Sequence, residues 1–319
     1  MLTPEFKPKN LIDGQHPFVQ IFILFSLCIL CSGIFSIIAL VLTKPLFHVE
    51  GIDKILEQAM KNPDKMAQNE ANVSMLKFLQ IMGTVGMFLV PAILFALLKP
   101  FNKDFYRLKK KLNLQQILLA VLVVTFTFPL ISLLIDWNMH LHLPWKELQK
   151  KIDDEQNANH TMENIFLNMP SLGYFFFNLL LMAILPAICE ELIFRGCAIH
   201  LFSKWFKNMH VAIWVSAAVF SFIHFQFYGF VPRMMLGALF GYLFYWSGTL
   251  WVPIFSHIIW NTYQLILSYM FQHNIGGINP DSDAIISPLV VIVSTVIFVA
   301  ALYLFFKKSK ERNQFLNYE

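Results

Sequence analysis

The chain has 319 residues, of which 57% are hydrophobic and 14% are charged, and its mean hydropathy is +0.57. This composition is too apolar for a soluble domain, so we expect a multispanning membrane protein. The formal net charge is +4, but the lysines and arginines gather in short segments beside apolar runs, as they do in membrane loops. We therefore expect the lipid bilayer, and no nucleic acid, among the partners.

Long apolar runs predict an all-α integral membrane protein with about eight transmembrane helices. Polar segments or turn residues separate these runs. The expected spans are Phe18 to Thr43, Met75 to Leu98, Leu114 to Ile135, a span that starts near Leu172 and runs into residues 187–195, Val211 to Phe225, Val231 to Trp246, Trp251 to Phe271 and Ile285 to Phe306.

Two polar segments interrupt the first half of the chain. Apolar residues recur at helical spacing among charges within 44–74, which predicts an amphipathic surface helix. Residues 136–168 hold most of the remaining acids and predict a polar helical hairpin or cap. We divide the chain into an N-terminal three-span region, 1–168, and a C-terminal five-span region, 169–319.

The basic residues predict the orientation in the membrane. Six cations lie between Lys99 and Lys111, and four lie between Lys307 and Arg312. By the positive-inside rule, both segments face the cytoplasm. An even number of spans then places both termini there, and the amino-acid usage favours a bacterial cytoplasmic membrane.

The four cysteines lie within or beside apolar runs, and the Cys28/Cys31 spacing lacks the second pair or the nearby histidines of a metal site. We interpret them as lipid-facing or packing residues. They are Cys28, Cys31, Cys189 and Cys197.

Two adjacent carboxylates and an arginine interrupt the fourth span. A charge at the centre of a membrane helix costs about 2.5–3.5 kcal/mol, so this cluster requires a reason, and chemistry is the best one. In a helix, Glu191 and Arg195 stand at i and i+4 and form an ion pair, whereas Glu190 lies about 100° round the helix and stays free. The alternative is an interfacial cluster in which Arg195 snorkels to lipid phosphates.

Two later spans also carry polar side chains. His224 shares a helical face with Phe220, and His257 shares one with Asn261. Taken alone, His224 is more typical of a packed core histidine, and the other pair is typical of polar contacts between membrane helices, worth about 0.6–2 kcal/mol. Three spans that each offer a catalytic residue type form a pattern that helix packing does not require.

Prolines and glycines mark the same helices. Pro186 and Pro253 each precede a polar residue by four positions, so we expect each to kink its helix and free a carbonyl there. The alternative is that proline is simply common in membrane helices. Gly237 and Gly241 have the small-xxx-small spacing of close helix packing.

One geometric difficulty accompanies this pattern. If the fourth span runs inward and the fifth outward, Glu190 and His224 lie toward opposite faces of the membrane. The difficulty disappears if the fourth helix continues to Leu201, which brings Glu190 near mid-membrane, and if the turn Phe225 to Phe230 is sunk in the protein.

The three motifs together resemble the CPBP family of intramembrane proteases, over about residues 170–275. That family includes the CAAX prenyl endopeptidases of the Rce1 type and bacterial relatives linked to bacteriocin processing or immunity. The motifs are Glu190-Glu191-x-x-x-Arg195, Phe220-x-x-x-His224 and His257-x-x-x-Asn261, in this order along the chain.

The resemblance implies that Glu190 and His224 activate a water molecule, and that Glu191 and Arg195 hold the acid in place. A carboxylate desolvated among apolar side chains is suited to act as a general base. The expected activity is therefore an intramembrane endopeptidase that hydrolyses a peptide bond near the membrane.

The resemblance also implies that His257 and Asn261 stabilise the oxyanion, because an imidazole and an amide at i and i+4 can donate to one oxygen. The expected partner is a membrane-associated protein or peptide substrate. For some members of such a family, this substrate carries a lipid. Two other readings stay open: a non-catalytic immunity factor or scaffold, and a proton-coupled transporter.

We expect no cofactor, but the residue types leave zinc open. Glu190, His224 and His257 would be an acceptable zinc set with a fourth place for water. Against this, the chain has no His-Glu-x-x-His helix, and Asn261 is a poor zinc ligand but a good oxyanion donor.

Overall fold

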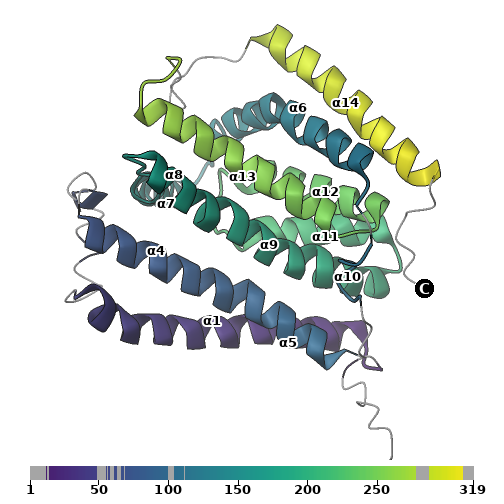
Figure 1. Ribbon diagram of the computed structural model, residues 1–319, viewed down its shortest axis with the longest axis horizontal. Helices are drawn as coiled ribbons and strands as arrows, with labels where there is room; N and C mark the ends of the chain where they lie inside the picture. The colour runs from purple at the N-terminus through teal and green to yellow at the C-terminus, as the bar shows by residue number, and fades with distance from the viewer. Residues whose placement is uncertain are drawn as a thin grey trace, which may run out of the picture.

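A computed structural model gives the structure of the chain and describes residues 12, 14–48, 55, 57, 61–62, 66–67, 69–99, 104–110, 112–277 and 287–311. In these residues all regular secondary structure is helical, and no strand is present (Figure 1). The predicted all-α fold is confirmed. The amphipathic helix predicted within 44–74 lies largely outside the described residues.

Five helical stretches in the described part of the chain are long and apolar enough to cross a membrane. The chain therefore has the make-up of a multi-pass membrane protein. The five stretches are α1 (Pro17–Phe47), the Glu70–Leu98 helix (α4, Glu70–Thr84; η1, Val85–Leu89; α5, Val90–Leu98), α6 (Leu114–Met139), the Leu172–Phe206 helix and α14 (Pro288–Glu311).

The remaining three predicted spans also form helices, but they are not among these five. They are α11 (Met209–Phe222), α12 (Phe230–Ser247) and α13 (Trp251–Gln272). At 1.5 Å per residue, the 14 residues of α11 extend for about 21 Å, less than the hydrocarbon core of about 30 Å. Of the motif residues, Phe220 lies on α11, His257 and Asn261 lie on α13, and His224 lies in the turn just after α11.

The Leu172–Phe206 helix is continuous over 35 residues and changes its winding four times. Two π-helical segments alternate with three α-helical ones, and π-helical turns are frequent at functional sites. Glu190 lies near the middle of this helix, as the predicted continuation through Leu201 requires. The segments are α8 (Leu172–Asn178), η2 (Leu179–Ile184), α9 (Leu185–Glu191), η3 (Leu192–Ala198) and α10 (Ile199–Phe206).

The predicted cytoplasmic loop that contains the six cations, of which the structure describes residues 99 and 104–110, is called the basic loop, and it lies against the turn between α12 and α13. Lys110 Nζ donates to Ser247 O at 2.9 Å, and Trp251 Nε1 donates to Leu108 O at 2.9 Å. At the same end of the bundle α6 begins and α14 ends, as a 3.0 Å hydrogen bond between Gln116 and Ser309 shows. The helix ends beside the predicted cytoplasmic loop therefore cluster together.

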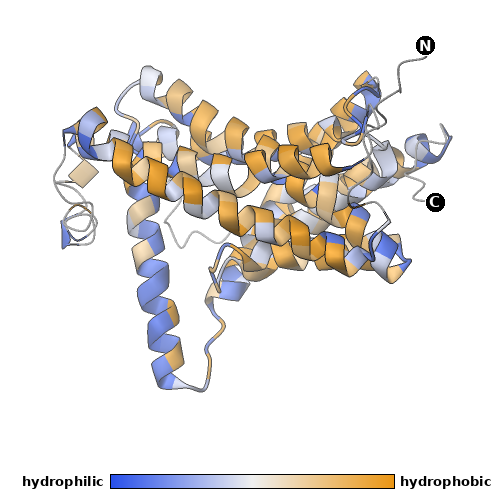
Figure 2. Ribbon diagram, turned by 90° about the horizontal axis from the view of Figure 1, so that it is seen from below, coloured by the Kyte–Doolittle hydropathy of each residue, from blue (hydrophilic) through white to orange (hydrophobic). Residues whose placement is uncertain are grey.

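At the opposite end, the polar helix α7 (Lys146–Phe166) runs across the direction of the apolar helices (Figure 2). It is a single helix, so the hairpin predicted as one form of this segment is wrong. Tyr228, in the turn between α11 and α12, donates to Asp153 of α7 at 2.7 Å and accepts from Gln149 at 2.6 Å. Tyr228 is buried, but Phe225 is 68% exposed, so only part of this turn is sunk in the protein.

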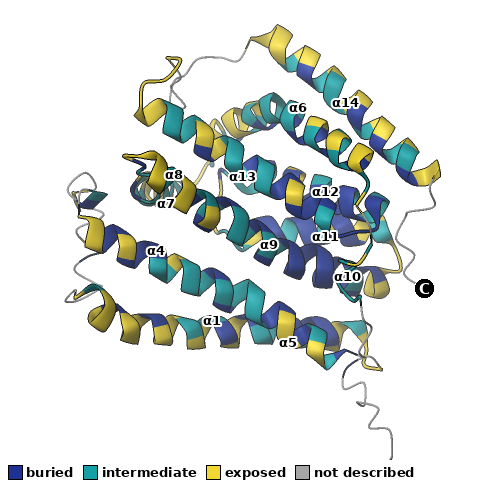
Figure 3. Ribbon diagram, viewed as in Figure 1, coloured by how far each residue is buried: buried dark blue, intermediate teal, exposed yellow. Residues whose placement is uncertain are grey.

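Buried residues concentrate on the helices that lie between α14 on one side and α1 and the Glu70–Leu98 helix on the other (Figure 3). The largest core cluster joins α1 and α5 to η3, α10, α11, α12 and α13. All four cysteines are buried and free, so they are packing residues and not lipid-facing ones.

Gly237 and Gly241 allow α12 to approach α11 closely, as their spacing predicted. A Cβ on Gly237 would lie 3.2 Å from the Cβ of Ala217. A Cβ on Gly241 would lie 2.8 Å from Cγ2 of Ile213. This contact brings the end of α11, with Phe220, toward the Leu172–Phe206 helix.

Candidate active site

The predicted ion pair between Glu191 and Arg195 is present and buried. Arg195 Nη1 donates to Glu191 Oε1 at 2.7 Å, and the side chains of Arg195 and Glu191 are 1% and 0% exposed. The pair spans the junction of α9 and η3, one turn apart on the same helix. The interfacial alternative, with Arg195 snorkelling to phosphates, is therefore wrong.

Three neighbours hold the guanidinium of Arg195 in place. Nη2 donates to the carbonyl oxygen of Gly237 at 2.9 Å. The rings of Phe220 and Phe240 lie 5.1 Å and 5.6 Å from Cζ, within the range of cation–π attraction. Gly237 thus has a second role beyond packing, because its backbone carbonyl accepts a hydrogen bond from Arg195.

His257 joins this pair from α13. Its Nδ1 lies 2.9 Å from Glu191 Oε1, which already accepts from Arg195. Because a carboxylate accepts only, Nδ1 carries the hydrogen of this bond and Nε2 faces away from Glu191. The ring of Phe240 lies 5.1 Å away and fixes the other side of the imidazole.

Glu190 faces the free nitrogen of the same imidazole. Glu190 Oε2 lies 3.8 Å from His257 Nε2, a distance longer than a direct hydrogen bond. The side chain of Glu190 is 12% exposed, whereas that of Glu191 is fully buried. The prediction that Glu190 stays outside the ion pair is confirmed.

His224 lies just beyond the end of α11 in the turn toward α12. Its Nδ1 lies 2.8 Å from Phe220 O, so Nδ1–H donates to this carbonyl and Nε2 is left as the acceptor. The ring of Phe220 lies 5.1 Å from that of His224 and 6.2 Å from that of His257. Phe220 therefore separates the two imidazoles, and the structure brings them to the same region without direct contact.

Asn261 lies one turn after His257 on α13, as predicted. Its Nδ2 is 3.5 Å from the carbonyl oxygen of Ala183, in the π-helical segment η2. This is the upper limit of a hydrogen bond, so the amide is only weakly held. It can turn toward another acceptor at little cost.

The two prolines do not act alike. Pro186 is the second residue of α9, just after the helix changes from π to α winding, in accord with a local disruption before Glu190. Pro253 lies in the first turn of α13, which begins at Trp251, so the predicted kink before His257 is wrong. The reason is that the backbone N–H groups of a first turn have no partner within the helix, and proline costs nothing there.

The donor set does not fit the zinc site that the residue types left open. Among the described residues, no three histidine, cysteine, aspartate or glutamate side chains converge in a way that could hold a metal ion. Glu191 is engaged by Arg195, and His257 directs one nitrogen to Glu191. We derive no step through a metal.

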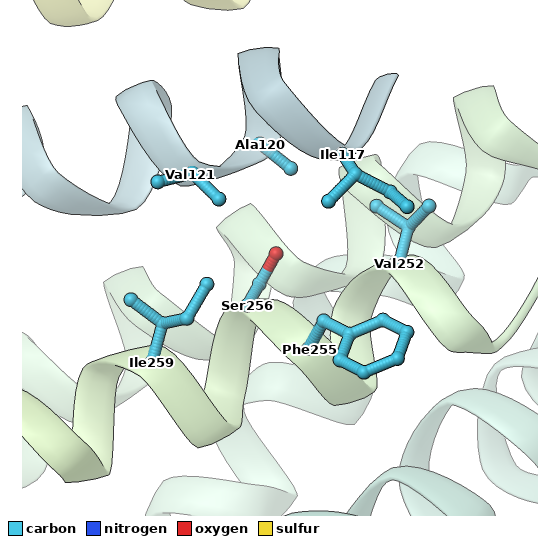
Figure 4. A pocket seen from close by; sticks show the side chains of 7 residues that line it. All are labelled: Ile117, Ala120, Val121, Val252, Phe255, Ser256 and Ile259. Atoms are coloured by element: carbon cyan, nitrogen blue, oxygen red, sulfur yellow. The ribbon is translucent and has the colours of Figure 1, made fainter. Parts of the chain in front are cut away.

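A narrow apolar pocket lies between α6 and α13 (Figure 4). The hydroxyl of Ser256 points into it and has no hydrogen-bond partner among the described residues. The remaining lining is apolar and offers no second polar group. Its lining residues are Ile117, Ala120, Val121, Val252, Phe255, Ser256 and Ile259.

The sequence reading missed Arg233, in the first turn of α12. This guanidinium interacts electrostatically with both Glu190 and His224, and its Nη1 is buried without a hydrogen-bond partner. A lone cation near the start of an apolar run is usually a snorkelling residue, so it gave no distinct signal. The only hint in the sequence was that Arg233 is the third residue of its predicted span, and therefore lies inside the span.

The comparisons with known proteins find a family match and a curated relative. Residues 172–263 match the family described as type II CAAX prenyl endopeptidase Rce1-like. Over 86 residues, the chain is 26% identical to the uncharacterized protein YpbD of Bacillus subtilis (strain 168). This alignment covers 26% of the chain and 41% of that relative, so the match spans less than half the length of the curated protein.

No solved structure matches the chain. The family match begins with the helix that carries the two glutamates and ends two residues after Asn261. It therefore contains all three sequence motifs and the contacts described above. Residues 172–263 are therefore similar to the family described as type II CAAX prenyl endopeptidase Rce1-like, and this similarity covers the segment that holds the site.

Proposed function

We propose that this protein is an intramembrane endopeptidase that hydrolyses a peptide bond of a membrane-associated protein or peptide. The observation that carries the proposal is the polar cluster of Glu190, Glu191, Arg195 and His257, buried among apolar helices within the family-matched segment. Ionisable groups inside a membrane protein are expensive, and they normally serve function.

In this proposal Glu190 is the general base, and it works with His224 on the attacking water. Glu190 is partly accessible and approaches His257 only to 3.8 Å, longer than a hydrogen bond, whereas Glu191 is committed to Arg195 and His257. The acceptor nitrogen Nε2 of His224 is available because Nδ1 binds the carbonyl of Phe220. Two acceptors around one water molecule would orient it and take its proton.

His257 and Asn261 would stabilise the oxyanion. With Nδ1–H directed at Glu191, Nε2 of His257 can donate only when the imidazole carries a second proton. Glu191 would stabilise the resulting imidazolium through a charge-assisted hydrogen bond. The weakly held amide of Asn261 would supply the second donor.

We further propose that eight helices cross the membrane, with α11, α12 and α13 enclosed by the five long apolar ones. The shared core clusters support this, because α12 and α13 pack against α6 on one side and α10 and α11 on the other. The site would then lie within a bacterial cytoplasmic membrane, in the C-terminal region 169–319. The N-terminal region 1–168 would contribute α1 and α5 to the core around it.

The test is comparative proteomics of membrane proteins from cells that make wild-type protein or the Glu190→Ala variant. We expect at least one membrane protein to be shortened only with wild type. Glu155→Ala, an exposed acid on α7, is the matched control and should behave as wild type. Cleavage of the same substrate by folded Glu190→Ala protein would refute the assignment of the base.

A further inference from the structure

Arg233 has one half of its guanidinium engaged and the other half free. Nη2 donates to Oε1 of Gln226 in the turn between α11 and α12. Nη1 is buried, and no described residue of the chain accepts a hydrogen bond from it. A buried guanidinium N–H without an acceptor costs about 1–3 kcal/mol or more, so an acceptor supplied by a ligand would relieve this cost.

The position of Arg233 connects this free donor to the proposed reaction. It interacts electrostatically with Glu190 of α9, with His224 and with Glu163 of α7. Arg195 has a direct ion-pair partner in Glu191. Arg233 differs, because the side chain that accepts its hydrogen bond, Gln226, is neutral. Arg233 is thus a cation at the edge of the site whose hydrogen-bonding capacity is incomplete.

Gly229 leaves the room that this guanidinium occupies. A Cβ on Gly229 would lie 2.9 Å from Nη2 and 3.0 Å from Nη1 of Arg233. The backbone φ of Gly229 is −90°, which any residue adopts, so its conformation does not require glycine. The glycine serves the close approach of Arg233 to the turn.

We propose that Arg233 is a substrate-binding residue whose free Nη1–H receives a carboxylate of the peptide substrate beside the scissile bond. The inference rests on the proposed peptidase site and deepens it by naming a chemical feature of the substrate. A guanidinium only donates, and its charge prefers a carboxylate to a neutral carbonyl. The first turn of α12 adds the positive end of the helix dipole to the same place.

Two sources of this carboxylate are distinguished by experiment: the C-terminus of the substrate and an acidic side chain. The probes are four libraries of synthetic ten-residue peptides, made with free or amidated C-termini and with acidic residues either present or replaced by their amides. Purified full-length protein in lipid nanodiscs is incubated with each library, and the products are identified by mass spectrometry. The same libraries are tested for binding to Glu190→Gln protein, which is not expected to turn them over.

We expect wild type to cleave peptides with one kind of carboxylate at least about tenfold faster, in kcat/KM, than their amide counterparts. Arg233→Gln should remove this preference by slowing the acids to the rate of the amides. Gly229→Ala should reduce it in the same direction, because the added methyl group displaces the guanidinium. Lys204→Gln, which changes an exposed cation of α10, should leave the preference intact.

A merely structural role of Arg233 predicts a different pattern, in which the acids and the amides lose rate equally. That result, or wild-type cleavage without any preference for a carboxylate, would overturn the inference. The binding arm separates this failure from that of the proposed function. If no peptide is cut, binding to the Glu190→Gln protein still tests the inference. Acidic peptides should bind more tightly than their amides when Arg233 is present, and not when it is replaced.

Discussion

At the scale of single residues, the site depends on a division of labour between two adjacent carboxylates. Glu191 is fully buried and accepts from Arg195 and His257 through one oxygen, Oε1. Its other oxygen, Oε2, is buried without a hydrogen-bond partner. Glu190 keeps partial access and faces the same imidazole at 3.8 Å. Neighbouring acids on one helix turn thus acquire different environments because they point in different directions.

This division predicts different consequences for mutation. Arg195→Ala should destabilise the folded protein by about 3–5 kcal/mol, because it leaves the Glu191 carboxylate buried without its cation. Glu190→Ala should retain the folded protein, because Glu190 has no direct hydrogen-bonded partner to leave behind. Thermal unfolding in detergent and the yield of monodisperse protein measure the effect.

The double variant Glu191→Ala/Arg195→Ala serves as the control for unpaired charge. It should recover part of the stability lost in Arg195→Ala, since it removes both members of the pair. Equal melting temperatures for wild type and Arg195→Ala would contradict the view that this pair supports the fold.

At the scale of elements, close helix packing places the site, and the glycines report where it is needed. Gly83 and Gly86 lie three residues apart on the Glu70–Leu98 helix. A Cβ on Gly86 would lie 2.5 Å from the Cβ of Phe35 and 3.1 Å from the carbonyl oxygen of Cys31, on α1. A Cβ on Gly83 would meet nothing within 4 Å.

The two glycines form a matched pair for a stability test. Gly86→Ala should destabilise the protein by about 1–3 kcal/mol, because the contact is with the backbone and Cβ of α1, which cannot yield without moving the helix. Gly83→Ala should be neutral or stabilising by up to about 1 kcal/mol, since alanine favours a helix over glycine. The difference between the two melting temperatures is the measurement, and equal values would show that α1 can shift freely.

At the scale of the whole molecule, the positions of helix ends give the protein two distinct faces. The basic loop contacts the turn between α12 and α13, where α6 also begins and α14 ends. The polar helix α7 covers part of the opposite end through Tyr228, close to His224 and Arg233 in the chain. The basic end and the α7 end therefore differ in charge and in their distance from the turn that holds His224.

The positive-inside rule converts this polarity into a topology prediction. A green fluorescent protein fused after Glu319 should fluoresce, and alkaline phosphatase at the same place should be inactive, because the C-terminus is expected in the cytoplasm. Reporters inserted between Leu141 and Leu143, ahead of α7, should give the reverse pattern. External signals from the C-terminal fusion would invert the orientation and place α7 in the cytoplasm.

The sequence by itself determined the features that depend on composition and on spacing within one helix. The apolar runs required helices because a backbone in lipid must satisfy its own hydrogen bonds. The i, i+4 spacing was enough to pair Glu191 with Arg195, to leave Glu190 free and to align His257 with Asn261, since neighbours one turn apart meet in any helix. The spacing of Gly237 and Gly241 likewise predicted a close contact between helices, but it did not predict which helix would be the partner.

Only the tertiary structure decided what depends on how helices pack. His257 meets Glu191 across 66 residues of sequence, and the carbonyl of Gly237 meets Arg195 across 42. Two further features depend on neighbouring helices: the π-helical segments around Glu190, and the start of α13 two residues before Pro253. A local sequence pattern cannot distinguish a kink from the start of a helix. Arg233 reached the site for the same reason: the folding of the turn after His224, and not its place in a span, brought its guanidinium within electrostatic range of Glu190.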